Sequence, residues 1–413
     1  MEFNPGEMSS GATSPLWVLW LLPWWGIAGS VGVKLAGAFM VACAVGAAYL
    51  HALCRGATAW EALLPVAVVA YCAAPAGFLG YETPLAALAG IAWVGVFAGS
   101  LTRQAWMAAL AALSPLVRPE LGIFAGVAFV DALLKRRWDA VRGLLGGTLV
   151  PVAYYGAMSV LTGSFSTSAY CRAFALRELA DVSILGLGFH SSVIVEAVRS
   201  GLLLVGGAAL VGIWDLWRVR NRLWVPALGS VVCFGLFFTT IAPLNHVRYA
   251  APIAFLLGYL ALVGLKAGER WHRAVRHVHS VVLALLVVAL IAKAWDERRR
   301  GWGFEVVTER ECAEILNTVA QPGEVVLAYE VQIRYWLRPQ LEVLSLDGIT
   351  DGKVAPYLAS ADIVGFLKRW RPHYWVANEA VWRRPFLRGS LLAEVLRRGD
   401  TVEIAGIRFE RLW

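Results

Sequence analysis

Residues 31–54 read VGVKLAGAFMVACAVGAAYLHALC, an apolar run in which Lys34 is the only lysine, arginine or acidic residue. A helix needs about 20 apolar residues to cross a bilayer, so this run predicts a membrane-spanning helix. Similar runs, some of them shorter, follow at 61–79, 84–100, 104–117, 119–134, 141–162, 199–218, 223–242, 249–267 and 278–295. The sequence therefore predicts a polytopic α-helical membrane protein with about ten spans.

The composition agrees with this class of protein. Of the 413 residues, 59% are hydrophobic and only 16% are charged, whereas soluble domains are close to one quarter charged. Many of the 19 tryptophans stand near the ends of apolar runs, which suits an indole ring at the headgroup level. The net charge of +8 is carried largely by short loops between apolar runs, where it orients a membrane protein. We therefore expect a lipid bilayer as partner and no nucleic acid.

The basic loops predict the orientation. The strongest contains Lys135, Arg136, Arg137 and Arg142, and the positive-inside rule places it in the cytoplasm. Successive loops lie on alternate sides of the membrane. Counting from this loop therefore also places Arg55, Arg103 and the clusters at 218–222 and 270–276 inside. The tail after Trp295 is then extracytoplasmic, although the cluster Arg298–Arg300 opposes this assignment. The expected localisation is the bacterial plasma membrane.

This alternation of loops requires that the first apolar run, Pro15–Gly29, does not cross the membrane. It is short and contains four tryptophans, so a helix lying in the membrane interface is as good an interpretation as a span. The predicted organisation is thus a partial outer loop with an interfacial helix at 1–30, a transmembrane bundle at 31–297 and a soluble domain at 298–413.

The C-terminal segment resembles ordinary globular sequence. Helices are predicted at Glu309–Ala320, Val354–Trp370 and Leu391–Arg398, and strands at Glu324–Ala328, Leu341–Leu346, His373–Val376 and Val402–Phe409. This alternation predicts a small α/β domain with a largely parallel sheet. The domain contains no Gly-rich strand-to-helix turn that would bind a nucleotide phosphate.

Several common kinds of site are not indicated. No pair of the six cysteines has the spacing of metal ligands, and four of them lie in apolar runs, which favours buried small hydrophobic residues. Residues 1–13 lack the basic region of a signal peptide. No cofactor is implied, and a divalent metal remains an open alternative.

Polar residues at the outer ends of spans are the candidate site residues, because ionisable groups at membrane depth are costly and often functional. Glu82 stands at an expected outer helix start, where an acid also interacts favourably with the helix dipole without further function. Arg118 and Glu120 flank Pro119 in an expected outer hairpin. They fit either a structural ion pair or an anion site, because a guanidinium matches phosphate oxygens.

Three cations are expected on this outer side. Lys34 lies near the end of a span, where snorkelling alone would explain it. His246, Arg248 and Tyr249 lie at another outer end. Together, Lys34, Arg118 and Arg248 predict a binding site for a lipid-linked phosphate.

Five segments in order resemble bacterial GT-C membrane glycosyltransferases, in particular the terminal arabinofuranosyltransferases of mycobacteria and their relatives. Gly80-Tyr81-Glu82-Thr83-Pro84 is similar to that group's Gly-Met-Glu-Thr-Pro segment, and Val117-Arg118-Pro119-Glu120 to its Thr-Arg-Pro-Glu. The remaining three are Phe3–Glu7 followed by Thr13–Trp17, Ser168–Arg172, and Leu346–Asp351. The resemblance runs along essentially the whole chain.

The resemblance implies a GT-C-like helical bundle and a reaction. A polyprenyl-phosphate-linked sugar is the donor, a glycan, lipid or protein hydroxyl is the acceptor, and a carboxylate removes the hydroxyl proton. It places Glu82 and Glu120 as candidate catalytic acids, and puts Lys34, Arg118, Arg172, His246, Arg248 and Tyr249 in the donor-binding set.

One departure from the family affects this expectation. Members carry an acidic pair in the first outer loop, preceded by a transmembrane helix, and the matching stretch would lie upstream of Phe3. A truncated chain is the favoured explanation. An inactive homologue serving as a scaffold, or replacement of the pair by Glu82 or Glu120, remains open. A transporter or lipid flippase is the alternative from another class, although no internal repeat supports it.

Overall fold

The structure is a computed structural model. It describes residues 14–78, 81–99, 104–162, 182–184, 187–189, 202–240, 247–269, 306–328, 333–334, 336–345, 363–376, 401–404 and 407–411, with a few single residues between 281 and 292. Most of the described residues are helical. The helices before residue 270 are α1 (Pro15–Cys54), α2 (Leu63–Phe78), α3 (Thr83–Phe97), α4 (Gln104–Val117), η1 (Pro119–Leu121), α5 (Gly122–Leu134), α6 (Trp138–Thr162), α9 (Leu202–Arg218), α10 (Trp224–Thr240), η2 (Val247–Ala250) and α11 (Ala251–Glu269).

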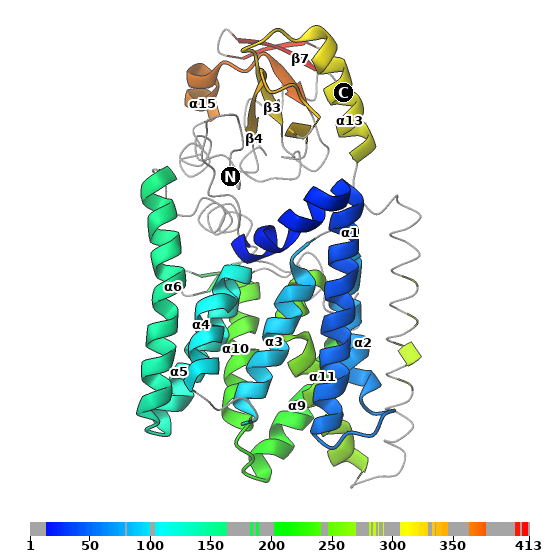
Figure 1. Cartoon of the computed structure of the whole chain (residues 1–413), viewed down its shortest axis with the longest axis vertical. Coiled ribbons are helices and arrows are strands. Elements are labelled where there is room, and N and C mark those ends of the chain that lie inside the picture. The colour runs from blue at the N-terminus through cyan, green and yellow to red at the C-terminus, as the bar shows by residue number, and fades with distance from the viewer. Residues whose placement is uncertain are drawn as a thin grey trace.

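These helices form an elongated bundle whose members run lengthwise beside one another (Figure 1). Helix α11 packs against α9, α2 and α3, and α4 packs against α6. Within the described chain, Val31–Cys54, Trp138–Leu161 and Arg248–Gly268 are long and apolar enough to cross a membrane. Several shorter apolar helices accompany them, among them Thr83–Phe97 and Trp224–Thr239. This composition suggests a membrane protein. The expected span at 278–295 falls almost entirely outside the described residues.

Helix α1 is bent where the two first apolar runs meet. Ala28 and Gly29 have non-helical dihedral angles, and the φ of Gly29 is +55°, a conformation that glycine adopts without steric cost. The rings of Trp20 and Trp24 lie 6.0 and 6.4 Å from that of Phe39, so the first part of α1 folds back on the second. The chain therefore does not continue straight from the first run into the second.

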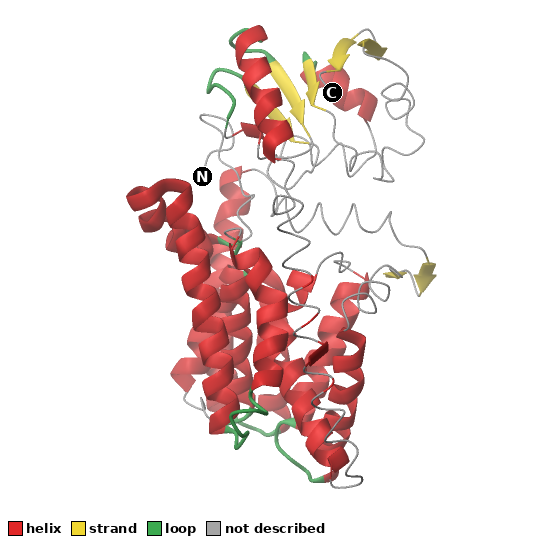
Figure 2. Cartoon of the chain, turned by 90° about the vertical axis from the view of Figure 1, so that its right-hand side faces the viewer, coloured by secondary structure: helices red, strands yellow, loops and turns green. Residues whose placement is uncertain are grey.

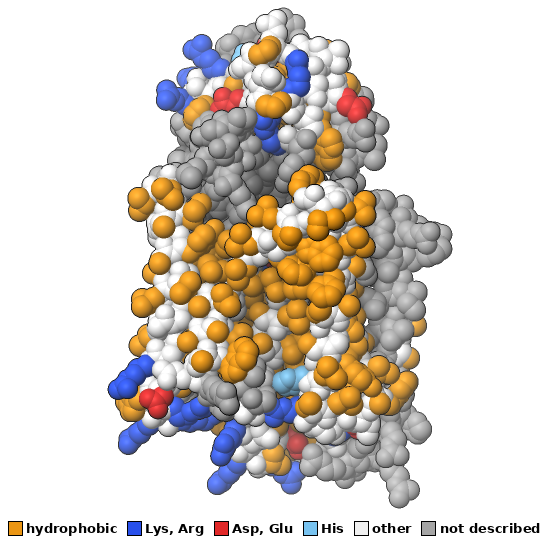
Figure 3. Space-filling view, viewed as in Figure 1, with side chains coloured by type: hydrophobic (Ala, Val, Ile, Leu, Met, Phe, Trp, Pro, Cys, Tyr) orange, Lys and Arg blue, Asp and Glu red, His pale blue; other side chains and the backbone are white. Residues whose placement is uncertain are grey.

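The loops at the two ends of the bundle differ in charge. Lys135, Arg136 and Arg137 between α5 and α6, and Arg220 and Arg222 between α9 and α10, are all exposed. Space-filling Figure 3 shows basic side chains gathered at the lower end of the bundle below a broad hydrophobic side. The Nη1 of Arg55 donates to the carbonyl of Ala98, which ties the ends of α1 and α3 together at this same end. The described basic loops that the sequence assigned to one side thus lie at one end of the fold, while Arg103 and the cluster at 270–276 lie outside the described residues.

The C-terminal part contains a five-stranded sheet beyond the other end of the bundle (Figures 1 and 2). Its order is β4 (Glu342–Ser345), β3 (Val325–Ala328), β5 (Tyr374–Val376), β7 (Ile407–Arg411) and β6 (Thr401–Ile404). The first four strands in this order are parallel, while β6 is antiparallel to β7. Helices α13 (Val306–Val319) and α15 (Ile363–Trp370) accompany the sheet, and Leu316, Val326 and Val343 lie in its core.

The expected strand at Val402–Phe409 is wrong in one respect. It is two strands, β6 and β7, with Ile404 opposite Ile407, because the intervening Ala405-Gly406 suits a chain reversal. A second, two-stranded sheet pairs β1 (Val182–Ile184) with β2 (Leu187–Phe189) between the expected spans 141–162 and 199–218, where no strand was predicted. The expected helix at Leu391–Arg398 and the first part of that at Val354–Trp370 lie outside the described residues.

Candidate functional site

Three chain segments far apart in sequence meet at the end of the bundle opposite the basic loops. They are the start of α3, the junction between α4 and η1, and η2 at the start of α11 (Figure 1). They bring Glu82, Arg118, Glu120 and Arg248 into one group of charged side chains, joined by direct contacts and by the ring of Tyr249. The C-terminal domain lies beyond this same end of the bundle.

Glu82 is held at the start of α3 by its neighbours. The N–H of Tyr81 donates to the carbonyl of Ala76, and Pro84 occupies the first turn of the helix, where its fixed φ suits helix initiation. The Glu82 side chain makes no hydrogen bond to the N–H groups of this helix start. Helix capping by a hydrogen bond therefore does not account for the acid at this position.

Arg118 is the buried centre of the group. Its backbone is extended, as expected for a residue before proline, and the residue is only 5% exposed. Its Nε lies 2.7 Å from Oε1 of Glu120 and 3.6 Å from Oε1 of Glu82. A buried charge of this kind needs a partner, and Glu120 supplies the close one.

The two carboxylates differ in a way that bears on chemistry. The Glu120 side chain is 9% exposed and forms the short ion pair, whereas the Glu82 side chain is 20% exposed and lies just beyond hydrogen-bond distance of Arg118. Tyr155 of α6 is close enough to Glu120 to interact with its charge, while its hydroxyl donates to the carbonyl of Pro115. Glu82 is thus the carboxylate that can receive a proton from an incoming group.

Arg248 is held by aromatic rings. Its Cζ lies 4.5 Å from the centre of the Tyr81 ring and 5.2 Å from that of Tyr249, distances typical of cation–π contacts. Both tyrosine hydroxyls are also within hydrogen-bonding reach of the guanidinium. Within the described parts of the chain, no carboxylate forms an ion pair with Arg248. Its positive charge is therefore positioned but not neutralised by these residues.

Tyr249 links the two arginines, because Cζ of Arg118 lies 5.1 Å from the centre of the same ring. Tyr81 was not among the predicted site residues. The only sequence signal for it was its position next to Glu82, which does not separate a site residue from a packing residue.

Packing between helices fixes the group. Trp93 in α3 donates from Nε1 to Oγ of Ser114 in α4 at 3.1 Å. A Cβ at Gly90 would collide with the carbonyl of Pro252, so the absence of a side chain lets α3 approach α11 closely. The hydroxyl of Ser14 donates to the carbonyl of Val117, which places the start of α1 beside Arg118. The separation of the charged groups thus depends on three contacts among α1, α3, α4 and α11.

The remaining predicted site residues do not join this group in the described structure. Lys34 is exposed and makes no ion pair with another described residue. It lies one turn before Gly37, which packs against the carbonyl of Gly77, so it belongs to the same end of the bundle. Arg172 and His246 lie outside the described residues. No cluster of three His, Cys, Asp or Glu side chains that could hold a metal occurs in the part of the chain that was searched.

The arrangement can bind an anion and accept a proton side by side. In formal charge, Glu82 and Glu120 balance Arg118 and Arg248. Because Glu120 forms an ion pair with Arg118, the groups left for a ligand are the Glu82 carboxylate and the Arg248 guanidinium.

No protein-family model matches the chain, and no curated protein matches it. The resemblance to GT-C glycosyltransferases thus rests on the sequence segments alone.

Proposed function

We propose that this chain is a polytopic membrane glycosyltransferase of GT-C type that transfers a sugar from a polyprenyl-phosphate donor to an acceptor hydroxyl outside the cytoplasm. The observation that carries the proposal is the placement of Glu82 beside Arg118, which shares the Tyr249 ring with Arg248, at the end of the bundle away from the basic loops. A lipid-linked donor reaches such a site through the bilayer, which accords with the long apolar helices and with the missing nucleotide loop.

In the proposed reaction, an acceptor oxygen attacks the anomeric carbon of the sugar. A new C–O bond forms while the bond between that carbon and the phosphate oxygen breaks, and its electron pair stays on the phosphate. The acceptor hydroxyl proton goes to Glu82. The leaving polyprenyl phosphate gains a negative charge, which Arg248 is placed to stabilise.

The other residues support these two. Arg118, paired with Glu120 at 2.7 Å, lies 3.6 Å from the Glu82 carboxylate and holds its place at the start of α3. Tyr81 and Tyr249 hold the Arg248 guanidinium in one orientation. Lys34 is the remaining candidate for the lipid phosphate, as an exposed cation at the same end of the bundle.

The test measures release of polyprenyl phosphate by the purified protein in lipid nanodiscs, with polyprenyl-phosphate arabinofuranose and polyprenyl-phosphate mannose as alternative donors. Replacing Glu82 by Gln keeps its size but removes the base, so turnover should fall about 10²- to 10⁴-fold while the thermal unfolding temperature is retained. Glu61→Gln is the matched control, because Glu61 is an acid in the loop at the other end of the bundle.

Full turnover by the Glu82→Gln variant would remove Glu82 from the mechanism. A folded wild-type protein that neither binds nor turns over either donor would support the scaffold alternative. The close Arg118–Glu120 pair is the observation that favours that alternative, since it pairs the two charges without any ligand.

A further inference from the structure

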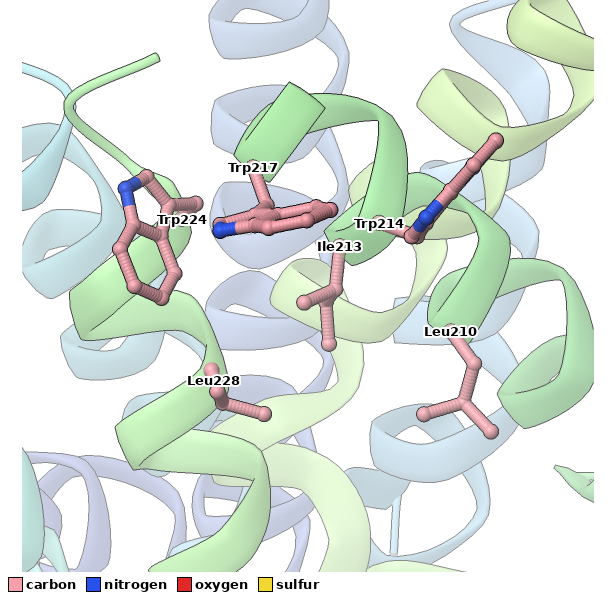
Figure 4. A pocket seen from close by; sticks show the side chains of 6 residues that line it. All are labelled: Leu210, Ile213, Trp214, Trp217, Trp224 and Leu228. Atoms are coloured by element: carbon pink, nitrogen blue, oxygen red, sulfur yellow. The ribbon is translucent and has the colours of Figure 1, made fainter. Parts of the chain in front are cut away.

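A hollow opens on the side of the bundle between α9 and α10, next to the basic turn that joins them. Its volume is approximately 330 Å³, and Leu210, Ile213, Trp214, Trp217, Trp224 and Leu228 line it (Figure 4). This volume is at the small end of the range of about 300 to 1,000 Å³ seen for ligand pockets. The site is separate from the charged group around Arg118, which lies at the opposite end of the bundle.

The lining is entirely apolar or aromatic, and much of it is exposed. Leu210 is 61% exposed and Trp217 is 55% exposed. In Figure 4 the rings of Trp224, Trp217 and Trp214 form a row, and Ile213, Leu210 and Leu228 lie below them. Tryptophan favours the membrane–water interface, so the hollow runs from headgroup level toward the hydrocarbon layer.

Three arginines lie at the end of α9 and in the turn that joins it to α10, between the lining residues Trp217 and Trp224 in sequence. Arg218, Arg220 and Arg222 are exposed, and no ion pair joins any of them to another described residue. Cζ of Arg218 lies 5.9 Å from the centre of the Trp214 ring. Asp215, the acid nearest in sequence, is buried. An apolar hollow next to three exposed cations fits an amphiphile with a negative head.

Hydrogen bonds within the turn define its backbone. The N–H of Asn221 donates to the carbonyl of Leu216, the N–H of Trp224 donates to that of Asn221, and the Oδ1 of Asn221 accepts from the N–H of Leu223. These bonds fix where the arginines stand relative to the tryptophans. The backbone of the turn therefore positions the three arginines close to the tryptophans of the hollow.

We propose that this hollow binds one acyl chain of an anionic glycerophospholipid, with the lipid phosphate against Arg218, Arg220 and Arg222. A soluble anion would make no favourable contact with the exposed apolar lining. A zwitterionic lipid, which has no net charge, would gain little binding energy from three arginines. The inference requires that the bundle spans a membrane, but it is independent of sugar transfer. A protein without transferase activity would still bind the lipid in this hollow.

The experiment uses the full chain in phosphatidylcholine nanodiscs. Each preparation contains a small fraction of phosphatidylglycerol or phosphatidylcholine that carries a photoreactive diazirine on one acyl chain. After illumination, mass spectrometry maps the labelled peptides. We expect α9 and α10 to be labelled at least about fivefold more by the phosphatidylglycerol probe, which corresponds to the effect of one basic side chain at an anionic surface.

Two pairs of variants distinguish a specific site from general attraction. Changing Arg218, Arg220 and Arg222 together to Gln should abolish the preference, whereas the same change at Lys135, Arg136 and Arg137 should preserve it. Leu210→Trp should reduce labelling by filling the hollow, and Leu204→Trp, at an equally exposed position of the same helix outside the lining, should not.

Equal labelling of α9 and α10 by the two probes would overturn the proposal. So would an equal loss in the two charge variants, because that result means attraction to the basic end as a whole. Thermal unfolding of each variant, compared with the wild type, shows that a loss of labelling does not come from a loss of fold.

Discussion

At the scale of single residues, the two arginines of the candidate site have different surroundings. Arg118 is buried and its Nε is taken by Glu120 at 2.7 Å. Arg248 is held by Tyr81 and Tyr249, whose ring faces and hydroxyls position the cation without cancelling its charge. Arg248 is thus the better candidate for the lipid phosphate.

This difference leads to a prediction for donor binding. Arg248→Gln should weaken binding of polyprenyl phosphate to the nanodisc-embedded protein about 10- to 100-fold, the usual worth of a hydrogen bond to a charged group. Arg248→Lys should weaken this binding less, because lysine keeps the positive charge. Arg142→Gln, at an exposed position in the basic end, is the control. An unchanged dissociation constant for Arg248→Gln would assign the phosphate to another cation.

A second residue-scale prediction concerns Glu61 at the basic end. Its carboxylate lies 2.8 Å from Nζ of Lys266 and accepts a hydrogen bond from the N–H of Thr58, whose hydroxyl accepts one from the N–H of Glu61. Burial raises the pKa of Glu61, but the hydrogen bonds from Lys266 and Thr58 and the charge of Lys266 outweigh it, so the pKa lies below its ordinary value of 4.5.

A lowered pKa in the folded state means that the ionised carboxylate stabilises the fold. This contribution is complete at pH values above 4.5, the ordinary value, and is lost as the pH falls through the lower pKa of the folded state. Because the pair is partly exposed, the contribution is at most about 1 kcal/mol. Wild type should therefore unfold at a slightly higher temperature than Glu61→Gln at pH 7, and the difference should shrink as the pH is lowered below 4.5. A difference that does not change with pH would contradict this origin.

At the scale of elements, close helix crossings hold the bundle together. A Cβ at Gly212 in α9 would collide with the carbonyl of Leu260 in α11, and one at Gly264 would collide with that of Ala208. Small residues at such crossings allow backbones to approach closely, which is a main source of helix association in membranes. The tight packing of α9 on α11 therefore depends on two glycines.

The crossing can be tested by a matched pair of substitutions in one helix. Gly212→Ala should destabilise the protein by about 1 to 3 kcal/mol, because an inserted methyl group forces the helices apart. Gly207→Ala places the methyl group in open space and should be neutral or slightly stabilising, since alanine favours helix more than glycine does. Thermal unfolding in detergent measures both, and an equal effect would refute the role of the crossing.

At the scale of the whole molecule, the two ends of the bundle differ chemically. One end has the exposed basic loops, and the other has the charged group around Arg118 and, beyond it, the C-terminal sheet (Figures 1 and 3). From this asymmetry we predict that the basic loops face the cytoplasm, by the positive-inside rule.

Topology reporters test this orientation. Alkaline phosphatase, which is active only outside the cytoplasm, should be active when fused after Trp413 and inactive when fused after Arg137. A green fluorescent reporter at the same two points should give the opposite pattern. Cytoplasmic signals from both fusions would place the sheet and the candidate site inside, and a lipid-linked donor would then have to be presented there.

The amino-acid sequence alone predicted the features that depend on neighbouring residues. It located the apolar helices, the basic loops at one end and three of the sheet strands, because apolar runs, charge clusters and alternating patterns are local properties. It missed the division of the last strand into β6 and β7, and it missed β1 and β2, since short strands carry little periodic signal.

Only the tertiary structure decided which charges meet. The sequence proposed Glu82, Arg118, Glu120 and Arg248 as site residues, but not that Glu120 would take Arg118 while two tyrosines hold Arg248. These pairings join α3, the junction of α4 with η1, and η2, segments that are brought together by the packing of Trp93 and Gly90. Contacts between distant segments depend on how whole helices pack, and no local pattern of residues records that packing.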